Sequence, residues 1–341
     1  MTALPATSDD RAFWELWLSP YHMPCITCAD EVGTFASISG EAKDTDTIAA
    51  ELEVDARALG IHLGLLAALG MVERREGKWR ASALARTWMH PDGEGYYGPL
   101  VQGFQRTSPL HEQMVASLRP DFDAAGIVSN VEEWERGELP LDRAVAIAAF
   151  MNSHSVAPSK AVSRLPLFAD HKSLLDVGGG SGVFAIELAR TWPELSTTIL
   201  EIDTMCDAAQ AYIDKAQMGA RVSTVAVDMF RQDWPTGHDA HFFSNIVHDW
   251  SDKTCHLLAE KSFAALEPGG RIMLHEALMD DDGTGPLIAA AFSMLMLLGT
   301  RGKQYTLAEL RSFLEGAGFV DVEAQTTGGA AYSLVTARKP A

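Results

Sequence analysis

The chain has 341 residues, enough for two domains, and carries a net charge of −19 at pH 7. So acidic a chain excludes duplex nucleic acid and anionic membranes as expected partners, and it suits a soluble enzyme. The polar, acidic N-terminus has no signal-peptide pattern and the most apolar run, 287–298, is too short to cross a bilayer, so we expect a cytoplasmic protein.

The first predicted element is an apolar helix at 11–28, rich in Trp, Phe, Leu and Met. A helix of this kind so near a terminus needs a partner to cover it, and two interpretations stay open: a dimerisation arm, or packing on its own domain. Cys25 and Cys28 form a lone C-x-x-C pair. Without a second pair, we interpret them as buried small side chains rather than as a zinc or redox site.

Two helices and a hairpin follow, in the order of a winged helix-turn-helix. The helices are predicted at 48–52, opened by Thr47, and at 56–69, capped by Asp55 and ended by Gly70; the strands are predicted at 71–74 and 79–81. DNA binding needs basic residues on the second helix, and its only basic residues are Arg57 and His62, among leucines and alanines. We therefore expect a protein interface or a structural role, and no nucleic-acid partner. Further helices are predicted at 83–89, 111–118, 131–136 and 141–155, and a domain boundary near Ser163.

The next segment, Ser173–Gly182, has the pattern strand, glycine turn, helix. Val183 stands where a dinucleotide fingerprint has its third glycine, and Asp176, two residues before the first glycine, would repel a diphosphate. Glu201, about twenty residues past the glycines, ends a second strand and is placed to accept ribose hydroxyls. The pattern predicts a ligand with a ribose, a positive charge and no diphosphate, which fits S-adenosylmethionine and fits NAD poorly.

Polar side chains end five predicted strands, and open parallel sheets bind ligands at this edge. They are Asp176, Glu201, Asp228, His248 with Asp249, and Glu276. Asp228 and Met229 are placed to hold adenine, although a plain turn after a strand explains them as well. Three further elements are predicted: a buried helix at 287–298, an amphipathic helix at 307–317 and a last edge strand at 330–338. We interpret the acidic run 280–282 as a solvated turn rather than a calcium or magnesium loop.

Four segments, L-L-D-V-G-G-G-S-G, D-M-F, N-I-V-H-D-W-S-D and L-E-P-G-G-R-I-M-L-H-E, stand in this order along the chain. In order and spacing the chain resembles the class I S-adenosylmethionine-dependent O-methyltransferases, in the branch of plant caffeate-type and bacterial antibiotic-tailoring enzymes of secondary metabolism. The resemblance implies a Rossmann-like, doubly wound α/β domain at 164–341. It also implies a mainly helical winged-helix dimerisation domain at 1–110 and, between them, a connector at 111–163 that contributes to the acceptor pocket.

The resemblance also implies roles for single residues. The cofactor set is Ser155, Asp176, Gly178, Gly180, Glu201, Asp228, Met229 and Ser244; the acceptor set is Met151, His154 and Asp249; the catalytic set is His248 as general base, Glu276 and Gln304. The apolar residues Phe292 and Met294, on an expected pocket helix, are added to the acceptor set because they suit a flat, apolar ligand. Core packing explains the methionines equally well. Two residues depart from the plant pattern: Ser244 replaces a lysine and Gln304 replaces a glutamate, which leaves Glu276 as the one acid expected to polarise His248. We expect no metal ion in the site, and we expect the chain to form a homodimer.

Methyl transfer from a sulfonium releases a neutral thioether, so the acceptor must be deprotonated and aligned. Proton transfer from a phenol of pKa about 10 to an imidazole of pKa about 6.5 is uphill by about 5 kcal/mol. A nearby sulfonium, or transfer concerted with attack, offsets this cost, whereas an aliphatic alcohol would demand far more. We therefore predict a small aromatic acceptor with a phenolic hydroxyl, and S-adenosylhomocysteine as the second product.

Three alternatives stay open. The methyl group can be transferred to a ring carbon ortho to the hydroxyl. We keep this alternative because Gln304 stands where the plant enzymes have an acid. A non-catalytic, winged-helix sensor of S-adenosylmethionine belongs to a different class, and the acidic charge counts against it. A metal-dependent methyltransferase would need a third ligand beside His248 and Asp249, and the sequence offers none at a convincing position.

Overall fold

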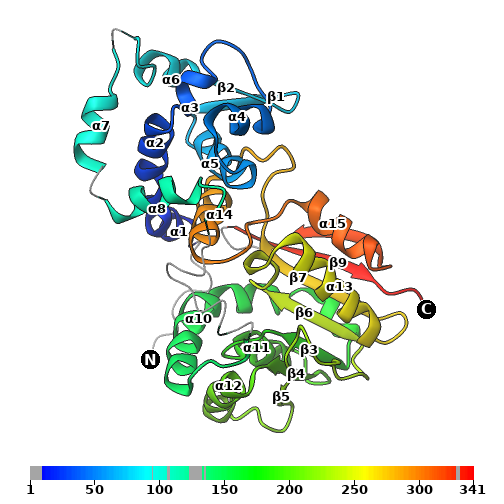
Figure 1. The fold of residues 1–341 in the computed structure, drawn as a ribbon. Helices are drawn as coiled ribbons and strands as arrows, with labels where there is room; N and C mark the ends of the chain where they lie inside the picture. Colours follow the sequence, from blue (N-terminus) through cyan, green and yellow to red (C-terminus); the bar gives the residue numbers. More distant parts are fainter. Residues whose placement is uncertain (1–9, 94, 106–107, 123–132, 134–135, 328–330) are drawn as a thin grey trace. The chain divides into compact units, whose positions relative to one another are not determined.

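A computed structural model describes residues 10–93, 95–105, 108–122, 133, 136–327 and 331–341, so the helix predicted at 131–136 lies outside the described residues but for its third and last positions. Two compact units make up the chain (Figure 1). The sheet unit comprises the described residues of Met1–Arg11, Asn130–Ala277 and Leu307–Ala341, and the helical unit those of Ala12–Ser129 and Leu278–Thr306. Each unit is described by itself below.

The sheet unit is built on a seven-stranded sheet with the order β5-β4-β3-β6-β7-β9-β8. The strands are β3 (Ser173–Val177), β4 (Ser196–Glu201), β5 (Val222–Ala226), β6 (Ala240–Ser244), β7 (Arg271–Ala277), β8 (Val320–Thr326) and β9 (Tyr332–Arg338). The first five in chain order pair in parallel, and β9 is antiparallel to both of its neighbours. The prediction that the last strand lies at the edge is wrong. Val320–Thr326 forms the edge strand instead, and its apolar side chains alternate too weakly to signal a strand.

Helices cover both faces of this sheet. They are α10 (Leu141–Val162), α11 (Val183–Thr191), α12 (Asp203–Ala216), α13 (Asp252–Ala265) and α15 (Leu307–Gly316), with the 3₁₀ turns η3 (Pro166–Asp170) and η4 (Val247–Asp249). Neighbouring residues of β6 show the two faces: His241 contacts Ser262 of α13, and Phe242 packs on Phe184 of α11. Both faces are therefore buried, and the carboxyl ends of the parallel strands meet at one edge, called the working edge below, which is where open parallel sheets bind ligands.

Helix α10 is longer than predicted. It continues through Pro158 to Val162, whereas the sequence favoured an end near Ser155. Ser155, Pro158, Ser159 and Val162 are all buried, so packing against the sheet unit outweighs the hydrogen bond that the proline cannot make. The extension gives the unit one continuous 22-residue helix that also contacts α11 and α12.

The helical unit contains the N-terminal elements and one helix from late in the chain. They are α1 (Arg11–Leu18), η1 (Ser19–Tyr21), α2 (His22–Glu31), α3 (Thr34–Ser37), α4 (Thr45–Leu52), α5 (Ala56–Ala68), β1 (Val72–Arg75), β2 (Lys78–Ala81), α6 (Ala83–Trp88), α7 (Gly98–Gln105), α8 (Pro109–Ser117) and α14 (Leu287–Gly299). The hairpin and the Asp55 cap of α5 are confirmed. The single helix predicted at 11–28 is interrupted at Pro20. Helix α4 begins earlier than predicted, because Asp44 rather than Thr47 caps it.

Segment 278–306 belongs with the N-terminal helices, because α14 packs on α5. Two arginines add to this attachment. Arg74 donates to the carbonyl of Asp282 at 2.6 Å, and Arg57 donates to the carbonyls of Arg301 at 2.8 Å and Gly302 at 2.6 Å. The two units therefore do not coincide with the three predicted ranges, which stay a prediction. The Asp282 carboxylate accepts from Thr284 within its own turn, as a solvated turn would.

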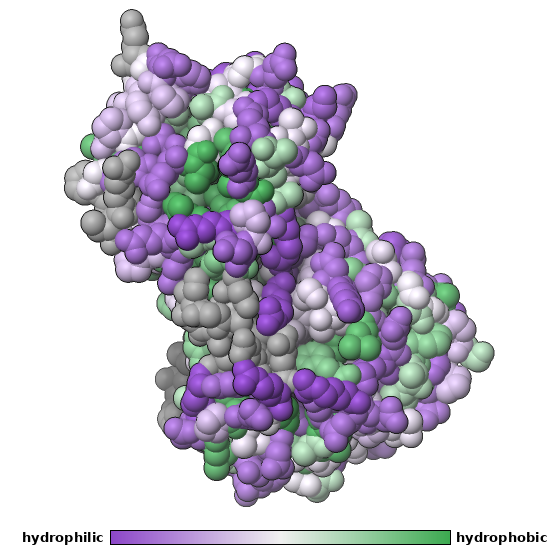
Figure 2. All heavy atoms as spheres, viewed as in Figure 1, coloured by the Kyte–Doolittle hydropathy of each residue, from purple (hydrophilic) through white to green (hydrophobic). Residues whose placement is uncertain are grey.

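The surfaces are mainly polar. Figure 2 shows hydrophilic residues over most of the visible face of each unit, with hydrophobic residues gathered in smaller patches. Helix α1 is an exception, since Phe13 is 69% and Leu16 70% exposed. All four cysteines are buried and free, which favours the interpretation of Cys25 and Cys28 as core side chains. None of the described helices has both the length and the apolar character needed to span a membrane.

Candidate active site

The glycine turn follows β3 directly, and its geometry requires glycines. Gly178 and Gly180 have φ angles of +67° and +56°, which residues with side chains rarely adopt. A Cβ on Gly178 would lie 2.6 Å from Cδ1 of Ile246, and one on Gly180 would lie 3.0 Å from Sδ of Met151. The turn is therefore closely packed against both the residues that follow β6 and α10, and side chains at these two positions would not fit.

Two buried carboxyl groups flank this turn. Asp176 is 1% exposed and Glu201 5%. Glu201 accepts hydrogen bonds from the N–H groups of Gly180 and Ile202, each at 3.1 Å. Burial raises the pKa of Asp176 to about 7, with the charge of Glu201 adding to the rise, and burial likewise raises the pKa of Glu201 to about 7. A bound cation, or hydroxyl groups that donate hydrogen bonds, would stabilise the charged form of such buried carboxyl groups.

Two buried polar atoms at the glycine turn have no hydrogen-bond partner among the described residues. Oδ2 of Asp176 is buried without a hydrogen-bond partner among the described residues, and so is Oγ of Ser181 inside the turn. Buried polar atoms are rarely left unsatisfied. The pair therefore fits a ligand that brings a positive charge and hydrogen-bond donors, as S-adenosylmethionine would.

The other predicted cofactor residues are found in varied surroundings. Asp228 is half-buried after β5, and its carboxylate pairs with Arg231 at 2.7 Å. Met229 follows it, and its carbonyl accepts from Trp234. The Ser244 hydroxyl lies 2.9 Å from Nδ1 of His275. These are the places where the structure puts the three residues; their binding roles stay a prediction.

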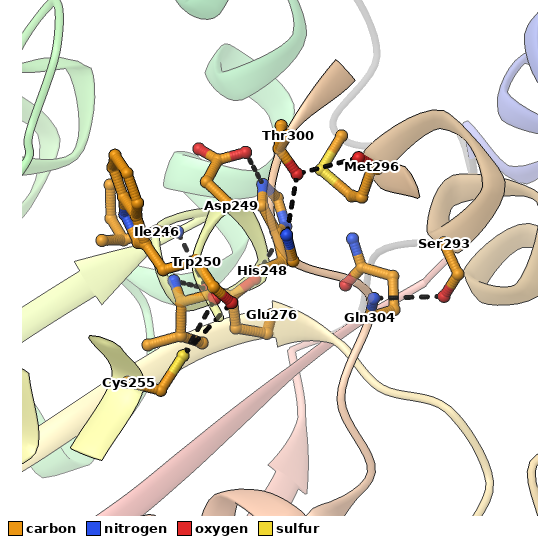
Figure 3. A network of polar contacts seen from close by, with 12 residues as sticks. Ile246, His248, Asp249, Trp250, Cys255, Glu276, Ser293, Met296, Thr300 and Gln304 are labelled. Atoms are coloured by element: carbon orange, nitrogen blue, oxygen red, sulfur yellow. Dashed lines mark hydrogen bonds and ion pairs between the residues drawn. The ribbon is translucent and has the colours of Figure 1, made fainter. Parts of the chain in front are cut away.

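The predicted base sits in η4, just past the end of β6, beside two carboxyl groups (Figure 3). Oε2 of Glu276 lies 3.0 Å from Nδ1 of His248, while Oε1 accepts the N–H groups of Ile246 at 2.9 Å and Val247 at 3.0 Å. One carboxyl group thus holds both the ring and the backbone that carries it. Oδ1 of Asp249 lies 3.6 Å from Nε2 of His248.

Electrostatics around the base come from Asp249 and His154. Burial raises the pKa of Asp249 to about 6, with the charge of His248 lowering it and that of Glu276 raising it. Burial lowers the pKa of His154 to about 4, and repulsion from His248 adds to the lowering. An imidazole oriented by a carboxylate can accept a proton at its second nitrogen, which is the chemistry of a general base.

Three predicted residues belong to the helical unit. Gln304 is buried, and its backbone N–H donates to Oγ of Ser293 at 3.1 Å, as Figure 3 shows. Phe292 packs on Trp14 with ring centroids 5.8 Å apart, and Met294 is fully buried. Within their own unit, Phe292 and Met294 are therefore core side chains of α14, and their contact with an acceptor stays a prediction.

Sequence reasoning missed three residues that shape this site. Ile246 closes the space beside Gly178, and Cys255 donates from Sγ to the carbonyl of Val247 at 3.3 Å, which ties α13 to the loop of the base. Neither contact has a local sequence signal. Arg231 does have one, because an oppositely charged residue three positions after Asp228 is a common pairing pattern. Among the described residues, no group of three or more His, Cys, Asp or Glu side chains is arranged to hold a metal ion.

Comparison with known proteins gives consistent results. The family described as "O-methyltransferase domain" matches residues 113–320. A 3-hydroxy-5-methyl-1-naphthoate 3-O-methyltransferase of Streptomyces sahachiroi is 33% identical over 301 residues, which cover 87% of this chain and 86% of that protein. The acetylserotonin O-methyltransferase of Bos taurus is 34% identical over 166 residues, 49% of this chain and 47% of that protein.

Solved structures show the same fold. A family 2 O-methyltransferase from Planctomyces limnophilus, in complex with apigenin, superposes with a TM-score of 0.86 at 23% identity and 99% coverage of both chains. Human N-acetylserotonin methyltransferase in complex with S-adenosylmethionine gives 0.61 at 22% identity, over 98% of this chain and 100% of that one. The predicted α/β fold with a helical N-terminal part is confirmed.

Proposed function

The chain belongs to the O-methyltransferase family, and on that premise we propose that it transfers the methyl group of S-adenosylmethionine to the phenolic hydroxyl of a small aromatic compound, with His248 as the general base. The single observation that supports His248 as the base is that the Glu276 carboxyl group contacts both the His248 ring and the backbone next to it. Its Oε1 accepts two backbone N–H groups beside His248, and its Oε2 lies 3.0 Å from Nδ1 of the His248 ring as an ion-pair contact without a well-formed hydrogen bond.

The cofactor's place follows from the glycine turn. The turn at Gly178 would lie against the methionine part, and Glu201 would accept the ribose hydroxyls. Asp176, which keeps an unpartnered oxygen within the described structure, would face the positive end of the ligand. S-adenosylmethionine supplies an activated methyl group when bound there; the residues of this chain bind it and move the acceptor proton.

Proton handling falls to His248. With Nδ1 facing Glu276, the ring presents Nε2 to the acceptor as a proton acceptor. As the proton arrives, the positive imidazolium is stabilised by the buried Glu276 carboxylate beside it. This offsets part of the cost of taking a proton from a weak acid, and the resulting phenolate attacks the methyl group in line with the departing sulfur.

The acceptor class is proposed from the relatives. The Streptomyces protein is named for a hydroxylated naphthoate and the Planctomyces structure holds apigenin, so both are associated with flat, hydroxylated aromatic compounds. A screen of naphthols, hydroxynaphthoates and flavones with radiolabelled S-adenosylmethionine tests the proposal. Transfer of label to at least one phenol is expected, and the matching methyl ethers should not react. Label in none of the phenols would contradict the proposal.

We expect binding of S-adenosylmethionine to weaken as the pH falls from 8 to 6. The folded chain holds protons on Asp176 and Glu201 up to a pKa of about 7, because burial disfavours their charged forms. A cationic ligand favours the charged forms, so binding below pH 7 must expel protons. The loss of affinity at pH 6 should be about tenfold if one of the two groups must lose its proton on binding, and up to about a hundredfold if both must, since each such group contributes at most tenfold per pH unit below its pKa.

Calorimetry in two buffers of different ionisation heat checks this, because it counts released protons as well as affinity. Proton release should be larger at pH 6 than at pH 8, and Asp176→Asn should release fewer protons than the unchanged chain. Equal affinity at both pH values without proton release would show that these carboxyl groups do not face the ligand.

We also propose a homodimer, on the evidence of α1. Phe13 and Leu16, one helical turn apart, are the most exposed large apolar side chains of the described chain. Sedimentation should give a dimer, and the double variant Phe13→Ser with Leu16→Ser should shift the population toward monomer. A monomer at all concentrations of the unchanged chain would overturn this proposal.

A further inference from the structure

Helix α10 carries a row of side chains next to the glycine turn. Met151, His154 and Ser155 share one face, because residues three and four apart lie together on a helix. Sδ of Met151 lies 3.0 Å from the point where a Cβ of Gly180 would be, so this face is closely packed against the turn. Ser155 is buried on it. A residue of this face therefore lies beside the proposed place of the methyl donor.

His154 connects this face with the base. Its ring is edge-on to Phe150, with centroids 5.3 Å apart, and its Nδ1 lies 3.3 Å from Oγ of Ser155. Met151, one helical turn before His154, packs on the glycine turn at Gly180, and Ile246, two residues before His248, packs on the same turn at Gly178. The two histidines therefore belong to elements, α10 and η4, that flank one glycine turn, and burial lowers the pKa of His154, with the charge of His248 adding to the lowering.

The protonation of His154 differs from that expected of a base. Its pKa of about 4, a result of burial and of His248, keeps it neutral near pH 7. A hydroxyl donating to Nδ1, as Ser155 is placed to do, leaves the single ring proton on Nε2. His154 is then a hydrogen-bond donor that carries no charge, and it neither repels the sulfonium nor opposes proton uptake by His248.

We propose that His154 donates its Nε2–H to the acceptor's phenolic oxygen while His248 removes the proton from that oxygen. The inference rests on the function proposed above. In the balanced step, the phenol O–H bond breaks and its proton moves to Nε2 of His248; an O–C bond forms, and the S–C bond breaks with its electron pair remaining on sulfur. His154 keeps its proton throughout and stabilises only the charge that develops on oxygen. His248 later releases its proton to solvent.

A donor of this kind has a measurable signature. Removing one preorganised hydrogen bond to a developing oxyanion typically lowers kcat by about 10²-fold. The loss should depend on the acceptor, because an acidic phenol needs less help to ionise than a weakly acidic one. A structural role of His154 would instead affect all acceptors alike and would extend to cofactor binding.

The test compares His154→Phe, which keeps an aromatic ring, with His154→Gln, which keeps a donor. Both are assayed with 2-naphthol and with a more acidic nitronaphthol, and S-adenosylmethionine affinity is measured by calorimetry. Ser153→Ala is the matched control, because Ser153 lies on the exposed side of α10 and its hydroxyl donates to the carbonyl of Phe150 in the same helix.

We expect His154→Phe to lower kcat about 10²-fold with 2-naphthol and clearly less with the nitronaphthol, and His154→Gln to recover most of the loss. Cofactor affinity should be unchanged in both. Full activity of His154→Phe, equal losses with both phenols, or loss of cofactor binding in both variants would overturn the inference. An unchanged chain that methylates neither naphthol, nor any phenol of the screen, would overturn the proposed function itself.

Discussion

Replacement of His248 by asparagine is expected to lower kcat by about 10² to 10⁴-fold, the usual contribution of a general base. Asparagine retains a donor for Glu276 but cannot accept a proton near pH 7. The buried Glu276 keeps its bonds to the backbone of Ile246 and Val247, so the loop should stay folded. Affinity for S-adenosylmethionine should therefore change little, and the loss should lie in the chemical step.

Initial rates with a phenolic acceptor, together with calorimetry of the cofactor, make the measurement. His256→Asn is the matched control, since this histidine lies on α13, with its ring on Phe313 at 4.8 Å, and should give turnover within about twofold of the unchanged chain. A His248→Asn variant that keeps more than a tenth of the original kcat would assign proton removal to another group.

The second large effect is expected from Gly178→Ala. The added Cβ meets Cδ1 of Ile246 at 2.6 Å, and the φ of +67° costs an alanine about 1–2 kcal/mol. Either the turn or Ile246 must move, and Ile246 is two residues from the base and bonds Glu276. We expect affinity for S-adenosylmethionine to fall by at least about tenfold, because 1.4 kcal/mol corresponds to a factor of ten.

Gly219→Ala is the control for this variant. Gly219 lies in the same unit, has no atom within 4 Å of an added Cβ and no left-handed φ. Calorimetry should show unchanged affinity in Gly219→Ala. If Gly178→Ala bound the cofactor as tightly as the unchanged chain, the glycine turn would not be where the methionine part lies.

The strands and the working edge could be predicted because their signals are local. Apolar runs ending in Gly178, Glu201 or His248 are readable from neighbours in the sequence, and parallel strands bring such ends together whatever the remaining contacts. The partners of these side chains could be predicted only in part. Glu276 beside His248 followed from the family resemblance, whereas the pairing of Asp228 with Arg231 was not predicted.

What the sequence could not show depends on long-range packing. Nothing local indicates that segment 278–306 belongs with the N-terminal helices, since the attachment uses α14 against α5 and the carbonyl contacts of Arg57 and Arg74. Helix α10 continues through Pro158 because the burial of one face of the helix, formed by Ser155, Pro158, Ser159 and Val162, outweighs the local helix breaker. In the same way, His154 and His248 stand 94 positions apart in the sequence, and only the fold places their elements against the same glycine turn.

The most direct test of the central claim is the fate of the methyl group. The chain is incubated with S-adenosylmethionine carrying a carbon-13 methyl group and with the phenol that reacts best in the screen, and the product is examined by carbon NMR. We expect a methyl signal of an aryl ether, with S-adenosylhomocysteine formed in equal amount, and loss of both in His248→Asn. A methyl signal on a ring carbon, or an unchanged signal in His248→Asn, would contradict it.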